Sequence, residues 1–455
     1  MSDLIDLSPD IAPLDTPFGP IHVARPTIPD RTVSIADCGA VAGGATMNTA
    51  AFARAIAACA EQGGGRVVVP AGVWLTGPIH LRSRIELHLE AGAEVRFSTR
   101  FEDYLPVVLV HSTVRLYNYS PLVYARDCTD IAITGPGMLN GQGQVWWPWK
   151  WEPKRAPHRM HQFNVEDTPL EQRVLGTVED GCRPRLIHLL DCRNVLLEGF
   201  TVRDSPSWTV HPAFCDNVIA RGLTVIGKGP NNDGINPESC RDVLVEHCLL
   251  DTGDDCVTIK AGKDQEAWRR GRSCERVLVR HCRAIGGHNI LAIGSETSGS
   301  VRDIYVHDCT SDSTGRGLNI KTRRGRGGVV ESIWLRNITI GIVKNEGFKI
   351  SMRYDGEPAE RAVNYEQTHA NSKDVPILRN IHISNVGCGR AAAAALIEGL
   401  PDQPIENLTL ENVTLMAERG FRAECVKGLT LKRVNITVAE GPSLELNQAD
   451  GVNIS

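Results

Sequence analysis

Several features on which many proteins depend are scarce or absent in this sequence. Aromatic residues make up only 5% of the 455 residues, so we expect no core built on large aromatic side chains. No run of about 18 apolar residues occurs, which argues against a membrane span. Basic and acidic residues nearly balance, at 49 and 54, with a formal net charge of −5. That balance argues against a dedicated nucleic-acid-binding protein.

The sequence also lacks visible export and zinc-binding signals. The N-terminal stretch MSDLIDLSPDIAPLD has neither the basic nor the apolar region of a signal peptide. We therefore expect a cytoplasmic protein, or a periplasmic or secreted one if a leader was removed. None of the 14 cysteines lies in a CxxC pair, so a structural zinc site is not expected. Free buried thiols are expected in preference to disulfides.

The chain is rich in glycine, with 43 residues, and in one internal repeat. Each copy alternates apolar β-branched residues with polar ones after an Asn or Asp, which predicts short strands. From Cys192 onward the copies recur every 21 to 34 residues, with one longer gap before Ile381, and an earlier copy begins at Cys128. They are CTDIAITGPGM at Cys128, CRNVLLEGFTV at Cys192, CDNVIARGLTV at Cys215, CRDVLVEHCLL at Cys240, CERVLVRHCRA at Cys274, VRDIYVHDCTS at Val301, VESIWLRNITI at Val330, LRNIHISNVGC at Leu378, IENLTLENVTL at Ile405 and VKGLTLKRVNI at Val426.

This repeat predicts a solenoid. Most copies have no helix-length amphipathic segment between them, so the strands of each coil are expected to pair with those of the next coil. The fold class is therefore all-β, a single parallel β-helix over residues 31–455 that follows an N-terminal extension over residues 1–30. The recurring Cys and Val positions are expected to stack inside it.

Two segments depart from the repeat. TMNTAAFARAIAACAEQ, residues 46–62, has an apolar stripe at helical spacing, with Thr46 or Asn48 as N-cap and Gly63–Gly65 as its end. We expect this helix to cap the N-terminal end of the solenoid. Residues 141–180 are rich in Trp, Pro and His and are predicted to form a long inserted loop near the cleft.

Carboxylates occur one repeat apart in the middle of the chain. Asp233 lies 22 residues before Asp255, close to one coil, and Asp254 adjoins Asp255. Equivalent positions on adjacent coils are about 4.8 Å apart, so these three side chains are expected on one face. Clustered carboxylates repel, so one stays protonated where others are ionised, as glycoside hydrolysis requires. Gly253 allows the kink by which Asp254 and Asp255 reach one cleft.

The structural alternative is that the Asn-Asp-Gly and Gly-Asp-Asp segments only form turns, and the one-coil spacing disfavours this alternative. His288 follows Asp255 by 33 residues, and Lys321 follows His288 by 33. In register, His288 can support a catalytic acid and Lys321 can pair with a substrate carboxylate. The structural alternatives are that His288 is only a turn residue and that Lys321 is only a solvated surface residue.

Taken together, these motifs resemble those of glycoside hydrolase family 28, the polygalacturonase family. The family motifs Asn-Thr-Asp, Gly-Asp-Asp, Gly-His-Gly and Arg-Ile-Lys correspond to NND at 231, GDD at 253, GHN at 287 and NIK at 319. The resemblance extends to the segment from DCGAVAGG to GPI and to SPSWTVHP at 205, and covers residues 30 to 440.

The resemblance implies a right-handed β-helix and an inverting hydrolase of pectic, galacturonate-containing poly- or oligosaccharides. It implies that Asp254 is the general acid and that Asp233 and Asp255 activate water, with carboxyls about 6.5–9.5 Å apart. His288 matches the supporting histidine, and Lys321 matches the lysine that holds the sugar carboxylate. No metal or other cofactor is implied. The pattern SETSG at 295 and the long inserts resemble exo-acting bacterial members.

The chain departs from the family at Asn232, Asn289 and Asn319. Asn319 replaces an arginine that helps to bind a uronate, so it leaves the sugar at that position open. Arg323, Arg324 and Arg326 nearby can replace that charge or form a solvated loop. Further candidates for substrate binding are Asn231, Trp208 and His211, although core packing is equally expected for the last two.

Other aromatic and histidine clusters have mainly structural interpretations. Trp146, Trp147, Trp149 and Trp151 can stack on sugars, but packing of the loop is favoured. His158 and His161 suggest a metal only weakly, because no further ligands accompany them.

Several functions remain open at this point. The leading prediction is an exo-acting galacturonosidase. Alternatives are a hydrolase of rhamnogalacturonan, xylogalacturonan or another α-glycan, a pectate lyase, and a non-catalytic glycan-binding solenoid. Beyond the saccharide we expect no nucleic-acid or membrane partner, and the oligomeric state is not predicted.

Overall fold

A computed structural model describes residues 11–354 and 372–455 of the chain. These residues divide into two compact units. Unit 1 contains residues 11–13, 22–163 and 168–254, and unit 2 contains residues 14–21, 164–167 and the described part of 255–455. The boundary falls between Asp254 and Asp255. A single continuous domain over residues 31–455 stays a prediction.

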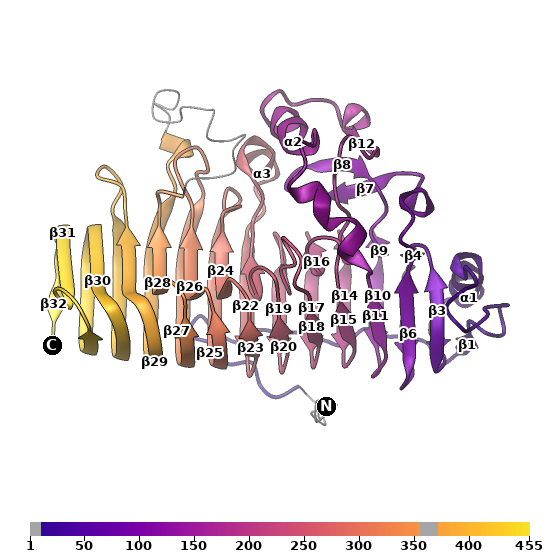
Figure 1. The fold of residues 1–455 in the computed structure, drawn as a ribbon, viewed down its shortest axis with the longest axis horizontal. Helices are drawn as coiled ribbons and strands as arrows, with labels where there is room; N and C mark the ends of the chain where they lie inside the picture. Colours follow the sequence, from indigo (N-terminus) through magenta and orange to yellow (C-terminus); the bar gives the residue numbers. More distant parts are fainter. Residues whose placement is uncertain (1–10, 355–371) are drawn as a thin grey trace. The chain divides into compact units, whose positions relative to one another are not determined.

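Unit 1 is built from three ladders of parallel strands (Figure 1). The first contains β1 (Thr32–Ser34), β2 (Gly65–Val69), β5 (Ile85–Leu89), β10 (Thr129–Thr134), β14 (Arg193–Glu198), β17 (Asp216–Arg221) and β19 (Arg241–Glu246). The second contains β3 (Gly72–Thr76), β6 (Ala93–Phe97), β11 (Met138–Asn140), β15 (Thr201–Arg203), β18 (Thr224–Ile226) and β20 (Leu249–Asp251). The third contains β4 (Ile79–His80), β9 (Val123–Arg126), β13 (Ile187–Leu190) and β16 (Val210–Ala213). Successive coils thus supply successive strands of each ladder, as the repeat predicted.

Unit 2 repeats this parallel pairing with longer strands. One ladder contains β21 (Val257–Ile259), β24 (Asn289–Gly294), β26 (Arg316–Lys321) and β28 (Glu346–Ser351). The others are formed by β22 (Cys274–Arg280), β23 (Arg283–Gly286), β25 (Val301–Thr314), β27 (Val329–Val343), β29 (Ile377–Glu398), β30 (Ile405–Val438), β31 (Leu444–Asp450) and β32 (Asn453–Ile454). A short helix, α3 (Asp264–Arg270), and the 3₁₀ turn Ser372–Asp374 connect strands. The predicted right-handed parallel β-helix is confirmed.

The Asn or Asp of each repeat has a conformational role. Asp130, Asn194 and Asn217 have φ values of 57°, 55° and 58°, in the left-handed region that Asn and Asp tolerate best after glycine. Their side chains also form a ladder, in which Asn194 Nδ2 donates to Asp130 Oδ1 at 3.0 Å and Asn217 Nδ2 donates to Asn194 Oδ1 at 2.9 Å. The repeat therefore bends the chain at one fixed position of each coil.

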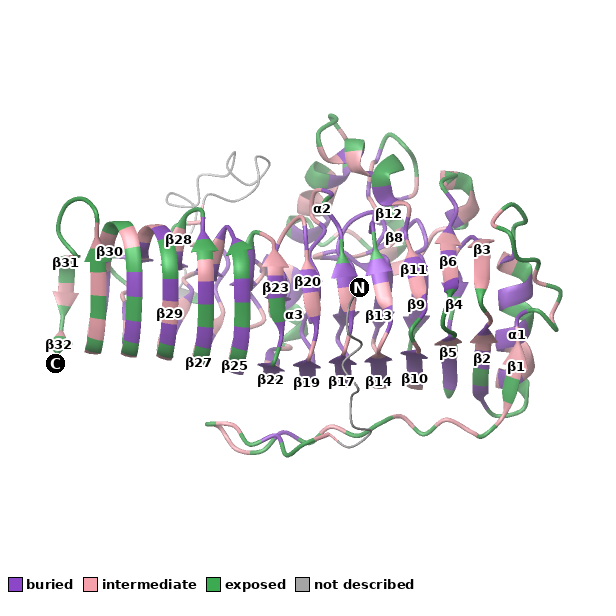
Figure 2. Cartoon of the chain, turned by 60° about the horizontal axis from the view of Figure 1, so that its bottom comes forward, coloured by how far each residue is buried: buried purple, intermediate pink, exposed green. Residues whose placement is uncertain are grey.

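The interior is lined by the small apolar positions of the repeat. Buried and exposed residues alternate along strands such as β27 and β29 (Figure 2). All fourteen cysteines are free thiols, and all are buried except Cys38, which is partly exposed. This confirms the expectation of free buried thiols. None of the helices within residues 11–354 and 372–455 is long and apolar enough to cross a membrane.

The predicted N-terminal helix is present as α1 (Thr49–Glu61). Asn48 occupies the N-cap position, but its side chain makes no capping hydrogen bond. Its amide instead bonds to the backbone of Val41, Thr46 and Leu75, which ties the helix start to neighbouring loops. The helix buries Phe52, Ile56 and other apolar residues of its inner face.

The prediction of an irregular loop over residues 141–180 is wrong in part. The segment contains the 3₁₀ turns Gly143–Val145, Trp147–Lys150 and Leu170–Gln172, the helix α2 (Ala156–Val165) and the strand β12 (Val174–Leu175). In unit 1, β12 pairs with β8 (Arg115–Asn118), which pairs antiparallel with β7 (Val108–His111). Ala156 and Phe163 of α2 pack on this small sheet in an apolar cluster with Val110, Leu116 and Leu175. The apolar partners that order the segment precede it in sequence, so its own composition did not reveal them.

Candidate active site

Asp233 lies in unit 1, at the edge of the third ladder. It follows β18 and precedes the bridge between Val210 and Ile235, where the ladder gains its next coil. The Asp233 side chain is only 3% exposed, and its Oδ2 accepts a hydrogen bond from Asn236 Nδ2 at 3.1 Å. This residue therefore presents a buried carboxylate held by a neighbouring amide.

The departure at Asn232 has a structural explanation. Asn232 is fully buried, and its Nδ2 donates to the carbonyls of Ser205 and Ser207 at 2.8 and 3.1 Å. Its Oδ1 accepts from the Gly229 amide at 3.1 Å. The Asn232 side chain therefore fixes the turn that carries Asp233 by bonding it to the segment of Ser205 and Ser207.

Asp254 meets the same loop through Asn231. Asn231 Nδ2 lies 3.4 Å from Asp254 Oδ2, and Asn231 Oδ1 accepts from Arg183 Nη2 at 2.6 Å. Arg183 also donates to the carbonyls of Pro206 and Pro230, at 3.1 and 2.8 Å. The sequence predicted that the NND and GDD motifs meet, and in unit 1 they do.

Arg183 is a residue of the candidate site that the sequence analysis missed. Burial and the neighbouring Arg185 lower the pKa of Arg183 to about 10, while the negative charges of Asp233 and Asp254 oppose that shift. Arg183 stays a cation at neutral pH and interacts electrostatically with both carboxylates. Its only sequence signal is the position of CRPR just before β13, two coils ahead of the motif.

The Gly253 kink arises from close packing. A Cβ on Gly253 would lie 2.3 Å from the Gly229 carbonyl oxygen, and one on Gly229 would lie 2.1 Å from Trp147 Cε2. Trp147 Nε1 donates to the Ser205 carbonyl at 2.8 Å. The indole and the two glycines therefore set the separation of the two motif loops within unit 1. Trp147 is better explained as support for these loops than as a sugar-stacking surface.

In unit 2, Asp255 is held on both oxygens. Asn289 Nδ2 donates to Asp255 Oδ1, and Lys321 Nζ donates to Asp255 Oδ2 at 3.1 Å. Asp255 is 1% exposed and Asn289 is 2% exposed. The departure at Asn289 therefore supplies a donor to a motif carboxylate. The sequence analysis flagged this position but did not find the contact.

The other predicted residues of unit 2 are spread over the ladder β24–β26. His288 is exposed at the start of β24, and its carbonyl accepts from the Arg316 amide. Asn319 is 6% exposed, and its Oδ1 has no hydrogen-bond partner within the described parts of the chain. Arg324 forms an ion pair with Asp402, and Arg326 forms one with Asp264.

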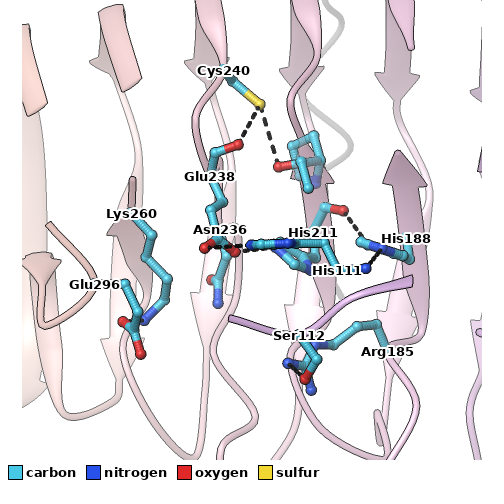
Figure 3. A network of polar contacts seen from close by, with 12 residues as sticks. His111, Ser112, Arg185, His188, His211, Asn236, Glu238, Cys240, Lys260 and Glu296 are labelled. Atoms are coloured by element: carbon cyan, nitrogen blue, oxygen red, sulfur yellow. Dashed lines mark hydrogen bonds and ion pairs between the residues drawn. The ribbon is translucent and has the colours of Figure 1, made fainter. Parts of the chain in front are cut away.

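Trp208 and His211 lie in the interior of unit 1 (Figure 3 labels His211). The Arg185 guanidinium lies 4.1 Å from the centre of a Trp208 ring, and Trp208 is only 7% exposed. His211 Nε2 donates to Glu238 Oε2 at 2.9 Å, and His111 Nε2 donates to Glu238 Oε1 at 3.0 Å. Their burial supports the core-packing alternative for both residues.

These histidines form one hydrogen-bonded network with the Glu238 carboxylate (Figure 3). Burial lowers the pKa of His211 to about 4, although Glu238 opposes this shift. Burial and the neighbouring His211 lower the pKa of His188 as well. His188 Nε2 accepts from the His111 amide at 3.1 Å and its Nδ1 donates to the His211 carbonyl at 3.0 Å, which defines its neutral tautomer. The pKa of Glu238 is well below its usual value because hydrogen bonds and charge from His111 and His211 outweigh burial.

The tryptophan and histidine clusters of residues 146–161 belong largely to packing. Trp146 and Trp149 are buried against Phe101 and each other, with ring centres 4.6 to 4.9 Å apart. Trp151 is 76% exposed. His158 and His161 both lie on α2.

A parallel β-helix whose turns carry hydrogen-bonded aspartates, here Asp233, Asp254 and Asp255, suits a polysaccharide-active protein. The model of glycosyl hydrolases family 28 matches residues 173–435, and the chain belongs to this family. A probable polygalacturonase of Vitis vinifera is 30% identical over 397 residues, which are 85% of this chain and 74% of the relative.

Solved structures agree with this assignment. The hyperthermoactive exopolygalacturonase from Thermotoga maritima is 37% identical, with a TM-score of 0.85, over 93% of this chain and 95% of that one. A family 28 exopolygalacturonase of Yersinia enterocolitica shares the fold, at 21% identity and a TM-score of 0.77, over 93% of this chain and 78% of that one. The chain is therefore a glycosidase, which decides against the lyase and the non-catalytic solenoid.

Proposed function

We propose that this chain is an exo-acting polygalacturonase that removes galacturonate from the end of pectic poly- or oligosaccharides. The observation that carries the proposal is the 37% identity to the Thermotoga maritima exopolygalacturonase over nearly the full length of both chains. Hydrolysis of one glycosidic bond consumes one water, and Asp254, Asp233 and Asp255 supply the acid and the base for it.

The proposed mechanism assigns a proton transfer to each carboxylate. Asp254 donates its proton to the glycosidic oxygen as the bond to the anomeric carbon breaks. Asp233 and Asp255 take a proton from the water that attacks the opposite face of that carbon, so the anomeric configuration inverts. Asp254 is the most exposed of the three carboxylates, which suits the residue that must reach the leaving oxygen.

The contacts around these carboxylates support their roles. Asn231 couples Arg183 to Asp254, so we assign Asn231 to positioning the acid as well as to the sugar-binding edge. Asn289 and Lys321 hold the two oxygens of Asp255, and an ionised carboxylate accepts such donors best. We assign His288, exposed at the start of β24, to hydrogen bonding with substrate or acid.

Exo action is supported by the covered outer face of the third ladder in unit 1. Tyr124, His188 and His211 occupy equivalent positions on successive coils and are at most 7% exposed. His111 of β7 covers this column through its bonds to His188 and Glu238. A polysaccharide cannot extend along a face that protein already covers, so the chain end is expected beside Asp233.

A decorated galacturonan remains a second candidate because Asn319 carries no charge. Where the family has an arginine, this chain offers a neutral amide to the sugar. A rhamnose- or xylose-containing substrate would then replace polygalacturonate as the preferred one.

The test is digestion of polygalacturonate with product analysis, beside an Asp254→Asn variant. We expect the wild type to release saturated galacturonate monomer from the start of the reaction, and the variant to release none, because an amide cannot donate the proton. Oligomers of mixed length would contradict exo action. Unsaturated products, or full activity of Asp254→Asn, would contradict the hydrolytic mechanism.

A further inference from the structure

Asn319 leaves the sugar-facing ladder of unit 2 with one positive charge fewer than the family motif provides. A uronate substrate still carries a carboxylate at each sugar, and burying that charge without a partner is costly. This inference rests on the substrate proposed above: if the chain takes galacturonate, a second cation on this face would compensate for the charge that Asn319 lacks.

Three cations on or directly beside strands of this ladder are already engaged with protein carboxylates. Lys321 contacts Asp255 at 3.1 Å, and Lys260 contacts Glu296 at 2.9 Å (Figure 3 labels the latter pair). Arg316 contacts Glu346 at 2.5 Å.

The arginines after Lys321 are no better placed to receive a ligand. Arg326 is 1% exposed and contacts Asp264 at 2.5 Å, while Arg324 pairs with Asp402. Arg323 keeps its Nε and Nη2 atoms buried. Arg324 and Arg326 therefore connect loops of unit 2 through ion pairs, and these ion pairs neutralise their charges.

Lys349 occupies the position next to Asn319 on the following coil. Strands β26 and β28 pair in parallel, with Asn319 opposite Lys349 and Lys321 opposite Ser351. In-register parallel strands point equivalent side chains to the same face. Phe348 and Ile350 on either side of Lys349 are buried in the core, at 1% and 0% exposed. Lys349 therefore points outward on the same face as Asn319.

The environment of Lys349 suits a ligand site. The side chain is half-buried, which restricts it without sealing it from solvent. Within residues 11–354 and 372–455, no ion pair or side-chain hydrogen bond is recorded for its ammonium group. Asn319 beside it has a buried amide oxygen with no partner in the same residues. Lys349 is thus a cation of this face whose charge no described carboxylate neutralises.

We propose that Lys349 binds a carboxylate of the galacturonan substrate and replaces, from one coil further along, the charge that Asn319 lacks. The ammonium group and the uronate form a charge-assisted hydrogen bond, with Lys321 on the adjacent outward column. No proton or covalent bond changes hands in this contact, so Lys349 determines binding and specificity and leaves the chemical step to the carboxylates.

Three variants test the proposal: Lys349→Met, which keeps the length of the side chain without its charge, Lys349→Arg, and Lys427→Met. Lys427 is an exposed lysine on β30 of the same unit and serves as the matched control. The measurements are kcat and KM for a short oligogalacturonate at two salt concentrations, and its Kd for the same variants in an Asp254→Asn background, which separates binding from turnover.

For Lys349→Met we expect KM and Kd to rise about ten- to a hundredfold with kcat little changed, because one charge-assisted hydrogen bond is lost. The salt dependence of KM should also fall. Lys349→Arg should restore affinity, and Lys427→Met should behave as the wild type.

Lys349→Met with wild-type KM, Kd and salt dependence would overturn the inference and leave the proposed function intact. A fall in kcat and thermal stability without a rise in Kd would overturn it as well, since that pattern indicates a structural role. A wild type that neither binds nor cleaves oligogalacturonate would overturn the proposed function, and this inference with it.

Discussion

Replacing Asn289 by glycine, the residue that the family motif has at this position, probes how Asp255 is held. Asn289 donates to Asp255 Oδ1 while Lys321 donates to Oδ2. The variant removes a hydrogen bond to a carboxylate, which contributes roughly 1.5–3 kcal/mol. Because about 1.4 kcal/mol corresponds to a tenfold change in rate, we expect kcat to fall about ten- to a hundredfold. Lys321 still orients the other oxygen, so the loss should stay below that of Asp255→Asn.

The assay compares kcat, KM and thermal stability of three proteins. Asn289→Leu keeps the volume of the buried side chain but removes the donor, so it should lose activity as Asn289→Gly does. Asn337→Gly is the matched control, because Asn337 also donates to an aspartate, Asp308, at 3.0 Å, on the exposed side of unit 2. It should keep the wild-type kcat. If Asn289→Leu and Asn289→Gly retain wild-type kcat while folding normally, the role of Asn289 in orienting Asp255 is refuted.

Three further predictions concern unit 1. Gly229→Ala places a Cβ 2.1 Å from Trp147 Cε2 and should displace the loop of Asp233, so we expect activity on an oligogalacturonate to fall at least tenfold. Gly387→Ala, whose Cβ meets nothing within 4 Å, is the control and should keep the wild-type activity. Equal activities of the two variants would contradict the packing argument. Arg183→Met removes the donor to Asn231 and should lower kcat more than it raises KM; an unchanged kcat would show that Asn231 holds Asp254 unaided. The pKa of His211 is about 4 in the folded state and about 6.5 in the unfolded state. Between these pH values the unfolded state binds more protons, so the free energy of unfolding decreases by roughly 3 kcal/mol as the pH falls from 6.5 to 4. Denaturant midpoints at both pH values measure this loss, His211→Gln should reduce it, and an unchanged pH dependence would refute the assignment.

Much of the fold was readable in the sequence because a solenoid is specified locally. Each copy of the repeat places apolar side chains at alternate positions and an Asn or Asp where φ must be positive, as at Asp130, Asn194 and Asn217. Pairing between neighbouring coils then follows from the repeat alone. The prediction failed at residues 141–180, because α2 is ordered by contacts with β7 and β8, which the local composition does not encode.

The candidate site was predictable in its carboxylates and not in their supports. The one-coil spacing predicted that Asp233 and the Asp254/Asp255 pair lie on one face, and within unit 1 Asn231 Nδ2, two residues before Asp233, lies 3.4 Å from Asp254 Oδ2. Arg183 and Trp147 come from segments with no motif of their own, and the contact of Asn289 with Asp255 was not predicted although both residues lie in motifs. Hydrogen bonds between side chains depend on rotamers and on loop paths, which a spacing rule does not contain.

The sequence by itself determined the parallel coil and the family, and it supplied the carboxylates proposed to react, because period and motif order are properties of the chain in one dimension. Tertiary structure decided which charges stay available to a substrate. Arg324 and Arg326 look free in the sequence, yet they are ion-paired with Asp402 and Asp264, whereas Lys349 gains its importance only from its place beside Asn319. Charge pairing falls off with distance in space, and the fold alone sets that distance.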